Sequence, residues 1–192
     1  MLDARRVRRR TRRTERPVSI AIDDRPDSTN EQKSRDGREA DEPRSGDLRF
    51  YLERSSKIVD APSIGPRMAE RLNRIGIITA GDLLTAKAAD VAGRLRHRRV
   101  DADTVLGWQH QITLVCRIPM LRGHDAQLLV AAGVTTPEQV AEQDPEELFS
   151  EIDAIARSSE GKRIIRGGKL PDQDEVTYWV ENARQRRPLR AA

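Results

Sequence analysis

The fold of this chain is decided by residues 62–72, which read PSIGPRMAERL and are followed closely by Gly76. Pro66 suits the first position of a helix, because its missing N–H has no intrahelical partner there. One buried face of that helix is then marked by Ala69, Leu72 and Ile75. Gly76 suits the left-handed conformation that ends a helix. We therefore predict a tight turn that opens a helix and leaves N–H groups free to bind an anion.

The same pattern returns 57 residues later without a gap. The matching residues are Pro62 with Pro119, Ala69 with Ala126, Leu72 with Leu129, Gly76 with Gly133, and Thr79 with Thr136. A string of matches at one offset indicates a duplicated unit. We interpret residues 58–115 and 116–187 as two copies packed as one domain over 48–187. The copies differ at the turn, because Arg122 stands where the first copy has Gly65, and Gly123 comes one place later.

Capping residues predict where the other helices begin. Residues that suit this role precede apolar positions at helical spacing and are Thr79, Asp101, Asp144 and Asp172. Residues 48–56 read as a short helix or an extended lead-in, and residues 162–169 as a basic loop. Trp108 and Trp179 have the spacing of core anchors, and Cys116 that of a buried, inert thiol. No segment alternates with period two, so we predict an all-α fold.

Residues 1–47 contain 13 basic and 11 acidic residues with few large apolar ones, which predicts disorder. Arginines crowd residues 5–16, whereas 17–47 lean acidic. The Arg-rich part has three interpretations: an arm that binds nucleic acid, a solvated basic tail, or residues included because the start codon is placed too early. Residues 48–192 hold 22 basic and 20 acidic residues, so the folded region is nearly neutral and ends in a short tail, 188–192.

The composition also bears on location. Cys116 is the single cysteine, which excludes an internal disulfide and fits a reducing compartment. No apolar run approaches the ~20 residues that span a bilayer. The twin arginines near the N-terminus lack the apolar segment of an export signal. We expect a cytoplasmic protein without membrane contact.

The turn, the segment from Gly76 to Leu84 and the second copy resemble tandem helix-hairpin-helix proteins. Residues 58–187 resemble an uncharacterised bacterial domain family with two such units. The first unit also resembles the C-terminal domain of the RNA polymerase alpha subunit. The resemblance implies that backbone amides of the turn approach a nucleic-acid phosphate, and the matching residues are Ser63, Ile64, Gly65, Arg67 and Met68. Ser63 departs from the family, which usually has a glycine there.

Two further groups are candidates for nucleic-acid contact. The densest basic run in the folded part contains Arg94, Arg96, Arg98 and Arg99. It either contacts a phosphate backbone beside the first turn or is a solvated face. In the second turn Arg122 and Gly123 are candidates, since Arg122 either blocks close backbone approach or grips a phosphate itself.

These observations favour a non-enzymatic module that binds double-stranded DNA without sequence preference. The alternative is a protein-interaction or scaffold module on the same fold, with an unidentified protein partner. An enzyme would rest only on the adjacent His124 and Asp125, and a metal site there lacks further ligands of matching spacing. We expect Asp125 to complement the helix dipole. No metal, other cofactor or small-molecule substrate is expected.

Overall fold

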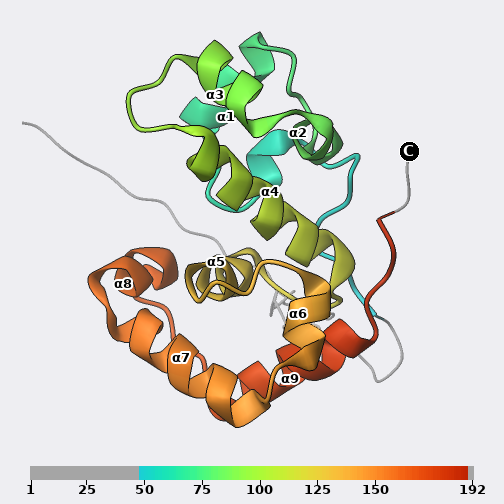
Figure 1. Cartoon of the computed structure of the whole chain (residues 1–192), viewed down its shortest axis with the longest axis vertical. Helices are drawn as coiled ribbons and strands as arrows, with labels where there is room; N and C mark the ends of the chain where they lie inside the picture. The colour runs from blue at the N-terminus through green and yellow to red at the C-terminus, as the bar shows by residue number, and fades with distance from the viewer. Residues whose placement is uncertain (1–47, 190–192) are drawn as a thin grey trace, which may run out of the picture. The chain divides into compact units, whose positions relative to one another are not determined.

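A computed structural model describes residues 48–189, and the predictions for 1–47 lie outside the described residues. These residues form nine α-helices and one 3-10 helix with no strand among them, which confirms the all-α prediction (Figure 1). The bounds are η1 Ile58–Asp60, α1 Pro66–Arg74, α2 Ala80–Thr85, α3 Ala88–Leu95, α4 Ala102–Arg117, α5 Gly123–Ala131, α6 Pro137–Glu142, α7 Pro145–Arg157, α8 Ser159–Ile165 and α9 Gln173–Arg184. Residues 48–56 are irregular and include a turn, so the lead-in is not a helix.

Side chains cap the helices where the sequence predicts it. The side chains of Thr79, Asp101, Asp144 and Asp172 each accept an N–H from the first turn of the helix that follows. Thr136 does the same for α6, and both threonines belong to reciprocal capping boxes, with Asp82 and Gln139 as the returning acceptors. These local bonds satisfy N–H groups that a helix start leaves without partners.

The elements recur along the chain. The helices α5, α6 and α7 begin 57 residues after α1, α2 and α3. The offset then rises to 71 for the closing helices, since Asp101 and Trp108 of the first copy match Asp172 and Trp179 of the second. A longer α7 and the additional α8 account for the difference. Residues 162–165, predicted as a loop, are therefore helical, and the loop begins at Arg166.

One continuous core joins the two copies. The helix α4 contacts α2 and α3 of its own copy as well as α5 and α6 of the next, as Figure 1 also shows. Trp108 and Trp179 are buried in this core, and burial raises the pKa of the Cys116 thiol to about 11. Among residues 48–189, no helix is both long and apolar enough to cross a membrane.

Candidate nucleic-acid interface

The first turn, residues 62–66, has the backbone that its sequence predicts. Pro66 occupies the first position of α1, and Ser63 has φ 62°, in the left-handed region that favours glycine. Ser63 is thus the position where the resemblance implies a glycine. Its hydroxyl donates a hydrogen bond to Oε1 of Gln111 on α4, at 2.8 Å. That bond holds the turn against α4.

The backbone N–H groups of the first turn differ in availability. Ile64 donates to the carbonyl of Ala61 at 3.3 Å, and Met68 donates to the carbonyl of Gly65 at 2.9 Å. Within residues 48–189, no acceptor takes the N–H of Gly65 or of Arg67. No side chain caps α1, and its first turn contains no acid. Of the five residues suggested by the resemblance, Ser63, Gly65 and Arg67 therefore have backbone N–H groups without an acceptor among residues 48–189.

The basic run after α3 lies beside this turn. A depression in the surface is lined by Gly65, Pro66, Arg67, Met68, Arg71 and His97, and we call it the first-turn surface. His97 belongs to the basic loop, residues 96–99, in which all three arginines are exposed. Arg94 is different, because its guanidinium donates to the carbonyl of Ile75 at the end of α1. The Arg94 side chain is therefore bound to the end of α1. The basic loop, in contrast, places His97 beside the first turn.

The second turn, residues 119–123, has the same backbone conformation as the first turn, but its N–H groups have different partners. Met120 has φ 61°, matching Ser63. The N–H of Arg122, however, donates to Oδ2 of Asp125 at 2.9 Å, so a carboxylate of the chain itself stands at the start of α5. The residue equivalent to Asp125 in the first copy is Met68. Gly123 packs against Pro62, since a Cβ there would lie 3.3 Å from Cγ of that proline.

Asp125 is only 2% exposed, and this burial makes its carboxyl group less acidic. Its pKa is raised to about 6, chiefly because burial penalises the charged form, while the neighbouring His124 acts in the opposite direction. Nε2 of His124 lies 3.0 Å from Oδ1 of Asp125. The predicted first-turn acid is therefore present, and it is held by the Arg122 N–H and the imidazole.

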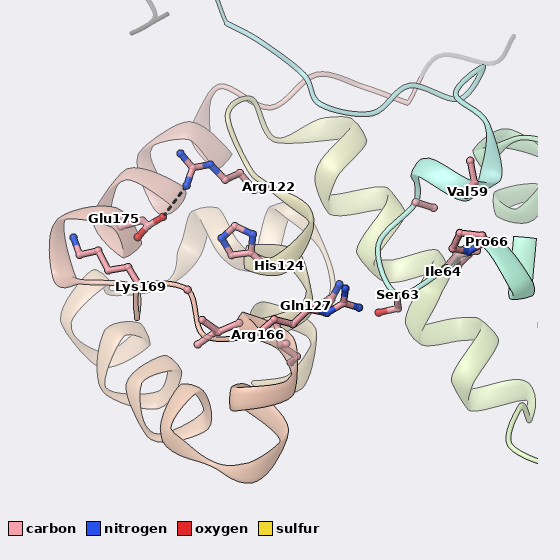
Figure 2. A pocket seen from close by; sticks show the side chains of 15 residues that line it. Val59, Ser63, Ile64, Pro66, Arg122, His124, Gln127, Arg166, Lys169 and Glu175 are labelled. Carbon is pink, nitrogen blue, oxygen red and sulfur yellow. Dashed lines mark ion pairs between the residues drawn. The ribbon is translucent and has the colours of Figure 1, made fainter. Parts of the chain in front are cut away.

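A cleft of about 750 Å³ is lined by residues of both turns, which contact each other directly at Gly123 and Pro62. One side is formed by Val59, Ala61 and residues 63–66, and the other by Arg122, His124 and Gln127, with residues of α8, Lys169 and Glu175 completing it. Figure 2 shows Ser63 and Pro66 across the cleft from His124, with Arg122 and Lys169 on either side of Glu175. An oxygen of Glu175 lies 3.9 Å from the Arg122 guanidinium. We call this the inter-repeat cleft.

One group of three side chains, two of which line the cleft, has the composition of a metal site. Ligand atoms of His124, Asp125 and Glu175 lie within 4.8 Å of one another, so Glu175 supplies a third ligand that the sequence did not reveal. A divalent cation there would face the positive charges of Arg122 and Lys169, both of which interact with Glu175. The carboxylates already have cationic or N–H partners, which makes this a poor cation site.

The geometry can be compared with known proteins. The family model described as "Domain of unknown function (DUF4332)" matches residues 62–186. The chain belongs to this family. The matched segment begins at the first turn and ends two residues after α9. No curated protein matches the chain, and neither does any solved structure.

The sequence did not indicate Arg71 or Glu175 as site residues, and it marked Arg166 and Lys169 only as part of a basic loop. Arg71 lies one helical turn after Arg67 on α1, and that spacing was a usable signal. Arg166, Lys169 and Glu175 line the inter-repeat cleft, but they are more than 40 residues from Arg122. Their proximity depends on how α8 and α9 pack on α5 and α7, which no local pattern encodes.

Proposed function

We propose that this protein is a non-enzymatic module that binds the phosphate backbone of double-stranded DNA through its first turn. The observation that supports this most is the uncapped start of α1, where the N–H groups of Gly65 and Arg67 have no acceptor among residues 48–189. The positive end of a helix dipole and free N–H groups attract a phosphate oxygen. The proposal extends the resemblance to helix-hairpin-helix proteins and to the alpha-subunit domain.

The charges around the turn favour the same ligand. Arg67, Arg71 and His97 line one depression, and the basic loop adds three exposed arginines. The only acid of α1, Glu70, is paired with Arg74. Backbone amides and guanidinium groups contact phosphates rather than base edges, so we expect affinity without sequence preference.

A second candidate, a protein-interaction module, is favoured by the second turn. Asp125 places a carboxylate where a phosphate would approach α5, so the two turns cannot bind a duplex in the same way. If the protein uses only one turn on DNA, or none, its other surfaces remain for a protein partner. A nuclease-resistant, stoichiometric protein partner recovered with a chain that does not bind DNA would favour this candidate.

The test is a salt titration of binding to a fluorescent duplex, followed by polarisation. We expect the affinity of the full chain to fall steeply with salt, and a chain lacking residues 1–47 to retain binding with a shallower slope. Arg67→Glu should weaken binding roughly tenfold or more and reduce the salt slope by about one. Arg184→Glu, the same charge change on an exposed residue of α9, is the control.

Two results would contradict the proposal. The first is the absence of any duplex complex at low salt. The second is equal weakening by Arg67→Glu and Arg184→Glu, because binding would then follow net charge rather than the first turn.

A further inference from the structure

We propose that the inter-repeat cleft binds a nucleoside phosphomonoester, either as a free nucleotide or as the phosphorylated end of a nucleic-acid strand. This goes beyond duplex binding by the first turn, because it requires no continuous backbone and depends on the cations Arg122, Arg166 and Lys169, although residues 63–66 line the cleft as well. The cleft has about 750 Å³, within the range of roughly 300–1,000 Å³ typical of small-molecule sites. A single phosphate would leave most of that volume empty.

The cations of the cleft indicate an anionic ligand. Arg122, Arg166 and Lys169 all line it, whereas Glu175 is the one carboxylate in its lining. Lys169 also holds Asp172 at 2.6 Å. Among residues 48–189, the Arg166 guanidinium has neither a carboxylate nor a carbonyl partner, so it is the cation most available to a ligand. Asp125 is buried behind His124 and does not line the cleft.

The number of cations favours a monoester over an internal diester. A phosphomonoester carries about 1.5–2 negative charges at neutral pH, whereas a diester within a strand carries one. Arg122 and Lys169 already face Glu175 and Asp172, so Arg166 is the cation that can take the additional charge of a monoester, and arginine binds phosphate oxygens in a bidentate manner. His124, 43% exposed on the cleft wall, adds a ring N–H or a positive charge when protonated.

The remaining lining suits a nucleoside. Val59, Ile164 and Ile165 offer apolar surface, and Val59 is 39% exposed. The amide of Gln127 has no hydrogen-bond partner among residues 48–189, so it can donate to and accept from a base edge or a sugar hydroxyl. The lining as a whole is more polar than apolar, so we expect its polar groups to make most of the contacts that fix the ligand.

The experiment is calorimetric titration of the full chain with adenosine 5′-monophosphate and, separately, with adenosine. We expect the monophosphate to bind at least about tenfold more tightly than the nucleoside, since the phosphate supplies the charge-assisted bonds. Arg166→Gln should weaken monophosphate binding about tenfold. Arg96→Gln is the matched control, because Arg96 also ends a helix with positive φ but does not line the cleft.

A second comparison separates the two sources of the phosphate. Short single strands with and without a 5′-phosphate are tested as competitors of the bound monophosphate. If the phosphorylated strand competes better, the site binds strand ends. If both strands compete equally and weakly, the site binds the free nucleotide. Arg67→Glu, which tests duplex binding, should leave monophosphate affinity unchanged. The proposal is overturned if the monophosphate does not bind, if adenosine binds equally well, or if Arg166→Gln and Arg96→Gln behave alike.

Discussion

At the scale of single residues, the two turns show how a backbone can be kept while its chemistry changes. Ser63 and Met120 have φ 62° and 61°, although neither is a glycine. A non-glycine residue in this region costs on the order of 1–2 kcal/mol. The turn geometry therefore persists because the surrounding helices determine it, not because the local sequence prefers it.

Replacing Ser63 tests this cost. Ser63→Gly and Ser63→Ala both remove the hydroxyl that bonds to Gln111, but only the glycine relieves the backbone. We expect Ser63→Gly to exceed Ser63→Ala in unfolding free energy by about 1 kcal/mol. Urea unfolding measures the difference. Equal stability of the two variants would mean that the turn carries no strain.

At the scale of elements, local signals predicted most helix starts. Thr79, Asp101, Asp144 and Asp172 are caps whose bonds lie within three residues, so the sequence alone indicates them. The helix α8 was not predicted, because it has only seven residues and its C-cap is Arg166 rather than a glycine. The inter-repeat cleft was not predicted for a different reason. Its walls come from helices that are far apart in sequence, and local sequence patterns do not indicate how such helices pack together.

The arginines around α3 are expected to separate into two roles. Arg94 donates to the last turn of α1, whereas Arg98 is exposed in the basic loop. We expect Arg94→Gln to lower the unfolding free energy by about 1 kcal/mol, and Arg98→Gln to change it by less than about 0.5 kcal/mol. Thermal unfolding measures both. Duplex affinity should show the stronger effect for Arg98→Gln, and the reverse order would contradict the assignment.

At the scale of the whole described region, charged groups tie residues 186–187, which follow α9, to α4, to α6 and to the segment before η1. Glu138 on α6 accepts hydrogen bonds from Arg117 of α4 and from Arg186, which follows α9. The hydrogen bond from Arg117 is the main reason that the pKa of Glu138 is lowered to about 2. Arg187 adds bonds to the carbonyls of Cys116 and Leu52. These contacts join segments that are far apart in sequence.

Acid should weaken this connection. A carboxyl whose pKa is lower in the folded state stabilises the fold above its unfolded value of 4.5, and this contribution is lost as pH falls from 4.5 toward 2. We therefore expect Glu138→Gln to be less stable than the natural chain near about pH 7, with most of the gap lost by about pH 2.5. Chemical unfolding at both pH values measures the gap. Glu142→Gln, on the same helix, should show no such convergence.

We propose that the first turn binds DNA because the start of α1 is open, whereas Asp125 closes the equivalent position of α5. Met68 is the counterpart of Asp125, so Met68→Asp introduces that carboxylate, and Met68→Asn is its uncharged control. Polarisation of a fluorescent duplex at low salt compares them. We expect Met68→Asp to lose roughly tenfold or more in affinity and Met68→Asn to stay within about threefold of the natural chain. Equal affinities of the two variants would contradict the account.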